Sequence, residues 1–230
     1  MFLLSIKLCI FHLLTVFLLL FKINFINSKL VFRNVKRGDI SNVANLCAEC
    51  FNGPFGILEV FKKKQAINTF ETQLSDRFQG LIEGGAKHVM ILGEDTDNHN
   101  KIIGFMELGT MPSPISTIKE WEGKKIEIKP EIPFLGNVVV DEDQRRKGIG
   151  SKLVKLALKC VESKWKDESM FLTVEADNLA AIKLYGKLKF DIILDESDNL
   201  NQPVGRVPRL FFMRSFNNNS DDNNDGDNEQ

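Results

Sequence analysis

The sequence has almost no excess of either charge. Its 230 residues include 30 Lys and Arg against 31 Asp and Glu, which leaves a formal net charge of -1. A protein that binds nucleic acid through its phosphates usually carries a basic face, and this chain shows no basic stripe with interleaved aromatic residues. The composition therefore excludes nucleic acid from the expected partners.

Cysteine is also scarce, with four residues at irregular spacing. Cys9 lies in the apolar N-terminus, so a processed chain keeps three thiols, and an odd number does not make a disulfide framework. Cys47 and Cys50 form a C-x-x-C pair, but no second Cys or His pair accompanies them, as a zinc site would require. We expect a helix with two small buried thiols and no bound metal.

The N-terminal residues 1–28 differ from the rest of the chain. An uncharged apolar run extends from Cys9 to Phe21 after Lys7, and it is shorter than the roughly 20 residues that a spanning helix needs. The pattern favours a signal peptide with Ser28 near the cleavage position, or a membrane anchor if the run continues to Ile26. We therefore expect entry into the secretory or endomembrane route, or membrane association through this segment.

Residues 30–216 follow the pattern of one folded domain, with strands and helices in alternation. The tail, residues 217–230, contains no apolar residue and cannot pack, so we expect an acidic, Asn-rich disordered segment. Residues 110–131 contain three prolines and are expected to form a long loop. Strands are expected at residues 30–35, 88–93, 102–108, 134–140, 171–174, 190–194 and 209–214, and helices at 39–50, 57–82 (broken in two), 148–163 and 178–187.

The most informative segment is the apolar strand 134–140 with the turn and helix that follow it. The first amides of a helix have no intrahelical acceptor and lie at the positive end of its dipole. Gly148 and Gly150 leave these amides uncovered, and Arg145, Arg146 and Lys147 add positive charge. These features predict a seat for a pyrophosphate group.

Two common nucleotide motifs do not fit this turn. A Walker loop needs Lys followed by Ser or Thr, whereas the order here is Ser151-Lys152. A Rossmann fingerprint needs a third glycine where Leu153 stands. The pyrophosphate therefore belongs to another class of ligand.

Two segments resemble one enzyme family. The segment RRKGIG, residues 145–150, resembles the R-x-x-G-x-G/A acyl-CoA loop of the GNAT N-acetyltransferases. The segment NLAAIKLYGKLKF resembles the family's N-x-x-A-x-x-L-Y-x-x-x-G-F pattern through Asn178, Ala181, Leu184, Tyr185 and Phe190, with Lys189 in place of the glycine. The resemblance implies a single GNAT-like α/β (α+β) domain with a mixed central sheet of about six to seven strands flanked by about four helices.

The resemblance also implies roles for particular residues. Amides from Arg146 to Ser151 would hold the diphosphate of acetyl-CoA, and backbone groups of Val138 to Val140 would align its pantetheine and polarise the thioester carbonyl. Asn178 would bond the CoA arm, and Tyr185 would protonate the departing thiolate. The expected binding residues are Val138, Val139, Val140, Arg145, Arg146, Lys147, Gly148, Ile149, Gly150, Ser151 and Asn178, and the expected catalytic residue is Tyr185.

Tyr185 is the only tyrosine in a chain with 18 Phe, which favours a role for its hydroxyl. A phenol with a pKa of about 10 can protonate a thiolate whose own pKa is about 8.5. The general base is not fixed, with Glu107, Glu175 and His88 as candidates, and we expect His88 to be an ordinary polar residue, either solvated or part of the hairpin. Relatives that acetylate protein N-termini have a glutamate at the position of Thr173.

The acceptor is expected to be the amine of a protein or peptide. An α-amino group with a pKa of about 8 needs less help from a base than a lysine at about 10.4. The stretch EIPFLGNVVVDEDQRRKGIG is similar to the plastid and cyanobacterial type of the family, which acts on protein N-termini and lysines, so import into a plastid is one hypothesis. A small-molecule amine acetyltransferase and a non-catalytic acyl-CoA-binding module remain alternatives. The sequence predicts no oligomeric state.

Overall fold

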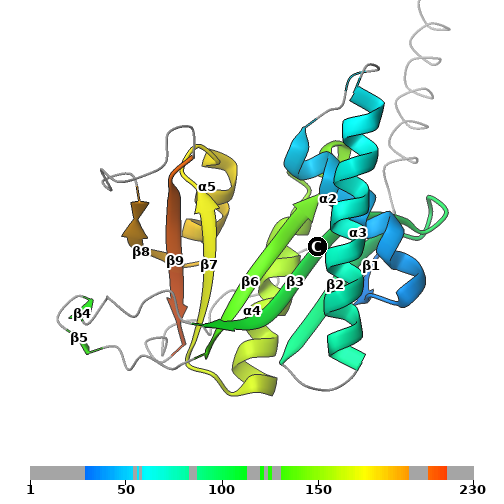
Figure 1. Cartoon of the computed structure of the whole chain (residues 1–230). Coiled ribbons are helices and arrows are strands. Elements are labelled where there is room, and N and C mark those ends of the chain that lie inside the picture. Colours follow the sequence, from blue (N-terminus) through cyan, green and yellow to red (C-terminus); the bar gives the residue numbers. More distant parts are fainter. Residues whose placement is uncertain are drawn as a thin grey trace, which may run out of the picture.

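A seven-stranded mixed sheet organises the domain (Figure 1). The computed structural model describes residues 29–53, 56, 59–82, 87–112, 120–121, 124–125, 131–196 and 207–216. The strands lie in the order β1-β2-β3-β6-β7-β9-β8, and only β6 and β7 are parallel neighbours. Their bounds are β1 Leu30–Asn34, β2 His88–Asp95, β3 Lys101–Pro112, β6 Glu131–Val140, β7 Ser169–Glu175, β8 Asp191–Asp195 and β9 Arg209–Ser215.

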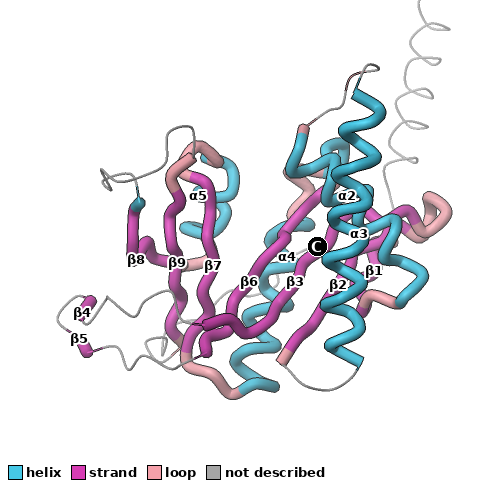
Figure 2. The backbone as a smooth tube through the Cα atoms, in the orientation of Figure 1, coloured by secondary structure: helices cyan, strands magenta, loops and turns pink. Residues whose placement is uncertain are grey.

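Four α-helices among the described residues cover the sheet (Figure 2). Helices α2 (Ile40–Asn52) and α3 (Val60–Ile82) lie on one face, and α4 (Ile149–Lys159), which continues as a π-helical segment η4 (Cys160–Trp165), lies on the other. Helix α5 (Leu179–Lys187) packs beside β7 and β9. Two short 3-10 turns, η1 (Arg37–Asp39) and η3 (Glu142–Gln144), precede α2 and α4. The predicted fold class, with its strand and helix numbers, is confirmed.

Each face of the sheet has its own apolar core, because the side chains of a strand alternate between the two faces. On the α4 face, Leu153 and Val154 are fully buried against Met106 and Leu108 of β3. On the other face, Val43 and Ala44 of α2, together with Cys47, pack over Leu92 and Phe105. The α4 core therefore fixes the helix whose first turn was predicted to bind pyrophosphate.

Three local predictions were wrong. Residues 60–82 form one unbroken helix, since no proline interrupts them. The expected loop 110–131 begins with the end of β3 and contains a separate strand pair, β4 (Glu120–Trp121) with β5 (Lys124–Lys125). Of the two expected buried thiols, Cys47 is buried and Cys50 is half-buried.

The predictions for the two chain ends concern residues 1–28 and 217–230, which lie outside the described residues. The signal or anchor segment, the route it implies and the disordered tail therefore stay predictions. Within the described part of the chain, no helix combines the length and the apolar character needed to cross a bilayer.

Candidate active site

Strands β6 and β7 separate after a short parallel contact. Their register joins only Phe134 to Phe171 and Leu135 to Leu172. From Gly136 to Val140, β6 continues beside β3 alone, while β7 pairs with β9 (Figure 1). One backbone edge of β6 thus has no strand partner among the described residues. The Val140 carbonyl accepts from Arg145 and Cys50, and the other polar groups of this edge can bind an extended ligand.

A β-bulge lies where the two strands begin to separate. Phe105 pairs with Val139 and Glu107 pairs with Gly136, so Asn137 and Val138 of β6 face a single residue of β3. Asn137 has a φ of 50°, in the left-handed region that few residues other than glycine adopt. The bulge interrupts the ladder at Asn137 and Val138, and pairing with β3 resumes at Val139 and Val140. It therefore lies in the segment of three valines that was predicted to align acetyl-CoA.

The predicted pyrophosphate turn joins the end of β6 to α4. Gly148 takes a φ of 79° immediately before the helix begins at Ile149. The first helical bond of the turn runs from the Lys152 amide to the Gly148 carbonyl, and no described residue accepts from the amides of residues 146–151. These amides point out of a helix N-terminus, which is the arrangement that binds phosphate.

The basic residues of the turn are exposed and only partly held by the protein. The Arg145 Nε donates to the Val140 carbonyl at 3.2 Å, which ties the turn to the end of β6. Lys147 Nζ donates to the Gln144 side chain at 2.9 Å, and Arg146 has a left-handed φ of 64°. The turn that carries the free amides therefore also carries three exposed cations, which suits a pyrophosphate ligand.

The turn lies against α5. A methyl group placed on Gly150 would be 3.4 Å from Leu184 Cδ2 and 3.7 Å from Val140 Cγ2. The start of α4, the end of β6 and the middle of α5 therefore meet at one point. The structure brings the two sequence motifs together at the open end of β6.

Asn178 begins α5. Its Oδ1 accepts from the Ala181 amide at 3.1 Å, which satisfies one of the free amides of the helix. The side chain is exposed, and its Nδ2 donates to no described residue. The predicted bond to the CoA arm is compatible with this cap, because the amide nitrogen remains available.

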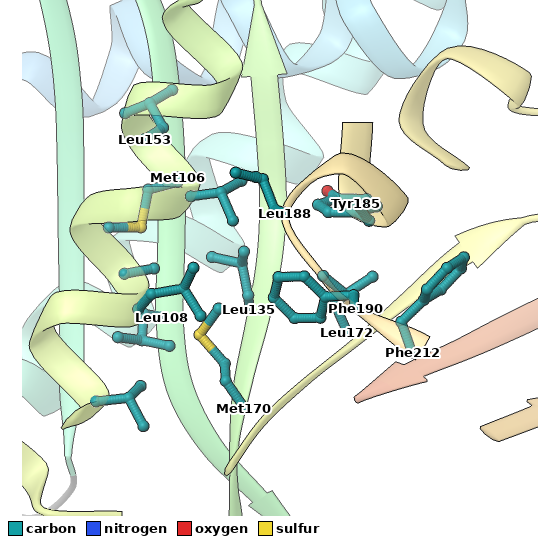
Figure 3. Close-up of a cluster of buried hydrophobic side chains, with 14 of the residues drawn as sticks. Met106, Leu108, Leu135, Leu153, Met170, Leu172, Tyr185, Leu188, Phe190 and Phe212 are labelled. Atoms are coloured by element: carbon teal, nitrogen blue, oxygen red, sulfur yellow. The ribbon is translucent and has the colours of Figure 1, made fainter. Parts of the chain in front are cut away.

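Tyr185 packs its ring into the α4 core. The ring centroids of Phe190 and Phe212 lie 5.8 Å and 6.0 Å away (Figure 3). No described residue bonds the hydroxyl group. Burial raises the pKa of this phenol to about 12, so it is protonated at neutral pH and can donate a hydrogen bond to a ligand.

Lys189 keeps the backbone geometry of the glycine that it replaces. Its φ is 60°, and two bonds close the end of α5: the Phe190 amide donates to the Tyr185 carbonyl at 3.1 Å, and the Lys189 amide donates to Gly186 at 3.1 Å. This is a Schellman motif with lysine in the left-handed position. The mismatch with the family pattern therefore does not alter the path of the chain.

The strain at Lys189 gives a stability prediction. A left-handed residue with a side chain costs about 1–2 kcal/mol, so Lys189→Gly should stabilise the domain by about 1 kcal/mol and raise Tm by roughly 2–4 °C. Lys187→Gly is the matched control, because Lys187 is exposed and still helical, and it should lower Tm. If Lys189→Gly lowers Tm as much as Lys187→Gly does in a thermal melt, Lys189 is not strained.

A buried polar network occupies the α3 side of the bulge, and sequence analysis did not predict it. The Glu107 carboxylate, with Glu107 only 7% exposed, accepts from Arg77 at 2.5 Å and from Asn137 Nδ2 at 2.6 Å. His88 Nε2 lies 2.8 Å from its second oxygen. These groups come from α3, β2, β3 and β6. The pair Gly136-Asn137 inside an apolar run is the one local signal for the bulge.

The contacts of Glu107 bear on whether it can be the general base. Although burial raises the pKa of Glu107, the bond from His88 and the charge of Arg77 lower it overall, so the carboxylate stays ionised and is a poor proton acceptor. Glu175 is exposed at the end of β7. His88 is a polar residue of the β2–β3 hairpin, as one form of the expectation had it, but it is not solvated, because its side chain is 11% exposed.

The network lines a pocket of about 870 Å³ that reaches the bulge. Lys87 lies at its rim, 3.5 Å from Asp167. Its charged lining therefore consists of two cations and one carboxylate that is already bonded. No group of three or more His, Cys, Asp or Glu in the described ranges is arranged to hold a metal ion. The lining residues are Arg77, Gly80, Leu81, Lys87, His88, Glu107, Gly109, Thr110, Met111, Phe134, Gly136 and Asn137.

Comparison with curated proteins finds short matches. An N-alpha-acetyltransferase of Saccharolobus solfataricus is 36% identical over 74 residues, which are 31% of this chain and 44% of that relative. The chain thus spans less than half the length of this curated relative.

Comparison with solved structures finds the same fold at low identity. Arabidopsis thaliana NAA60 in complex with acetyl-CoA aligns over 82% of this chain and 99% of its own, with a TM-score of 0.58 and 19% identity. A mutant of the spermidine N-acetyltransferase SpeG from Vibrio cholerae aligns over 82% of this chain and 95% of its own, with a TM-score of 0.53 and 18% identity.

Comparison with protein families identifies the family of the chain. The model of the acetyltransferase (GNAT) family matches residues 50–190, which include β6, the pyrophosphate turn, α4 and α5. This is more than half of the 230 residues, and it contains both motifs that sequence analysis identified. The chain belongs to the acetyltransferase (GNAT) family.

Proposed function

We propose that the protein transfers the acetyl group of acetyl-CoA to the α-amino group of a protein or peptide N-terminus. The main support for this transfer is one observation. The free amides of the turn, the open edge of β6 and the helix that carries Tyr185 lie together, as the contacts of Gly150 with Val140 and Leu184 show. The amides and three cations suit the diphosphate, and the edge of β6 suits the amide groups of the pantetheine arm.

The chemistry needs few groups from the protein. The acceptor ammonium loses one proton, its nitrogen forms a bond to the carbonyl carbon, and the C–S bond breaks. As the amide forms, the nitrogen loses its second proton. The sulfur leaves as a thiolate, takes one proton and becomes the free thiol, so the net reaction releases one proton. The hydroxyl of Tyr185, which no described residue bonds, is the donor to the sulfur. Amides of β6 near the bulge stabilise the oxyanion without reorganising.

Two features favour an α-amine over lysine or a polyamine. Thr173 leaves β7 without a carboxylate at its centre, and Glu107 is already bonded by three donors. An α-amino group with a pKa of about 8 is partly neutral at pH 7.5, whereas a lysine at about 10.4 is almost fully charged. In addition, the two cations of the pocket and its single bonded carboxylate do not attract a polycation.

The acceptor class is tested by comparing three amines at pH 7.5. The first substrate is a peptide with a free N-terminus, the second is a peptide whose N-terminus is formylated and whose only amine is one internal lysine, and the third is spermidine. The first should be acetylated with a kcat/KM at least about 10-fold higher than the other two, because a larger fraction of its amine is neutral. Mass spectrometry locates the acetyl group. Faster turnover of spermidine would overturn the acceptor class while leaving the transferase intact. If calorimetry shows bound acetyl-CoA and no amine is acetylated, the chain is a non-catalytic binding module.

A further inference from the structure

The bulge in β6 requires an explanation, because asparagine is held where the backbone is unfavourable. A residue with φ near 50° costs about 1–2 kcal/mol in the left-handed region, although Asn tolerates it better than most residues. Asn137 has this φ in the middle of a strand that is bonded on one side only. Something else must hold it there.

The side chain of Asn137 supplies the restraint. Its Nδ2 donates to Glu107 at 2.6 Å, across the irregular step of the β3–β6 register. Glu107 cannot swing away, because Arg77 of α3 holds the same oxygen at 2.5 Å and His88 of β2 lies 2.8 Å from the other. Three elements thus fix the carboxylate, and the carboxylate fixes the bulge.

The bonds are of the strong kind. A carboxylate that accepts from a guanidinium and an amide makes charge-assisted hydrogen bonds, and Glu107 is 7% exposed, so water competes little for them. The cation that favours the ionised carboxylate is Arg77 on α3. Lys87, which lines the same pocket, is directed to Asp167.

We propose that Arg77, His88, Glu107 and Asn137 form a latch that positions the bulge, so that the amides of Val138 to Val140 keep the orientation that the thioester requires. This rests on the proposed function only in that the bulge serves acetyl transfer. These are positioning residues: Glu107 holds the backbone and takes no proton from the acceptor.

Kinetics separate a latch from a base. Asn137→Ala and Glu107→Ala should each lower kcat about 10-fold with the KM for acetyl-CoA little changed, because the turn is intact. The double variant should lose about 10-fold and not 100-fold, a coupling of about 1.4 kcal/mol. Glu107→Gln should stay within about 3-fold of wild type, because its oxygen can still accept from Arg77 and Asn137 while its nitrogen donates to His88 in the other tautomer.

Two kinetic results would overturn the latch. The first is a kcat that falls about 100-fold in the double variant, the product of the two single losses. Glu107→Gln as inactive as Glu107→Ala, with a flattened pH–rate profile, would make Glu107 a base and overturn it as well. Glu94→Ala is the matched control, because Glu94 is a buried carboxylate with an arginine partner, Arg33 of β1, at 2.8 Å, and it lies where β2 pairs with β1, away from β6. It should lower Tm and leave kcat unchanged.

A measurement without turnover distinguishes failure of the latch from failure of the proposed function. Hydrogen exchange of the peptide that covers residues 136–141 should be at least about 10-fold faster in Glu107→Ala and Asn137→Ala than in wild type and Glu94→Ala. Asn137→Gly should fold readily, because glycine accepts this φ, yet show the same faster exchange. Unchanged exchange in all three variants would refute the latch, even if the wild-type protein acetylates no amine.

Discussion

Tyr185→Phe is expected to lower kcat by at least about 100-fold while acetyl-CoA still binds. General acid catalysis contributes about 10²–10⁴-fold, and the phenylalanine removes only the hydroxyl. The ring is buried against Phe190 and Phe212, and the hydroxyl makes no bond to a described residue. The substitution therefore removes no contact that stabilises the fold, and Tm should change little. Steady-state kinetics with a peptide acceptor, and calorimetry with acetyl-CoA, measure the two quantities.

The raised pKa of Tyr185 gives an expectation for the pH–rate profile. Burial raises it to about 12, so the phenol is protonated through the whole range of an ordinary assay. The alkaline limb of the wild-type pH–rate profile should therefore not come from Tyr185, and an amine acceptor should determine the acidic limb. Tyr185→Leu is the companion variant: it should lose the same activity and in addition lower Tm, because it leaves a cavity. Undiminished turnover by Tyr185→Phe would remove the hydroxyl from the mechanism.

The chemistry-bearing motifs could be predicted because each is local. A strand that runs into R-R-K-G-I-G, and a helix that begins at Asn178, specify their own backbones, and the observed positive φ of Gly148 and the cap by Asn178 are local consequences. The hairpin of β2 and β3 also follows from its polar turn. The single domain and its strand number were confirmed for the same reason.

The sequence did not predict features that depend on contacts formed only in the folded protein. α3 buries only Leu74 and Phe78 among its 23 residues, so its apolar pattern is weak, and a break was expected where the chain simply continues. Asp39 stands immediately before α2 but does not cap it, because Arg33, which also bonds Glu94 of β2, takes its carboxylate. Neither outcome follows from a window of sequence, because the local signal of α3 is small and the place of the Arg33 side chain depends on a distant strand.

The latch was beyond sequence analysis for a related reason. Its four side chains are separated along the chain by up to 60 positions, from Arg77 to Asn137, and only the order of β2, β3 and β6 brings them together. Glu107 and His88 were candidates for the base as separate residues. Their bond to one another changes the chemistry of both, since a carboxylate with three donors is held ionised.

Gly148→Val is expected to weaken acetyl-CoA binding by about 10- to 100-fold. Gly148 has a φ of 79°, which a β-branched residue tolerates poorly, and such strain costs about 1–3 kcal/mol. A methyl group at this position would meet nothing within 4 Å, so the cost is one of backbone conformation and not of space. Because the turn is exposed, the free protein can relax to a negative φ. Binding must then restore the strained turn, so the cost is expressed in Kd.

Two further variants distinguish an effect of backbone conformation at residue 148 from an effect of side-chain size beside the phosphates. Gly148→Asn should bind within a few-fold of wild type, since asparagine accepts a left-handed backbone. Gly150→Ala carries the smaller side chain two residues further on, where the backbone is helical and the nearest atom would be Leu184 Cδ2 at 3.4 Å, and it too should bind nearly normally. If Gly148→Asn weakens binding as much as Gly148→Val, the glycine is needed to leave room for the phosphates. If only Gly148→Val is weak, the left-handed turn itself places the amides of residues 146–151 around the diphosphate.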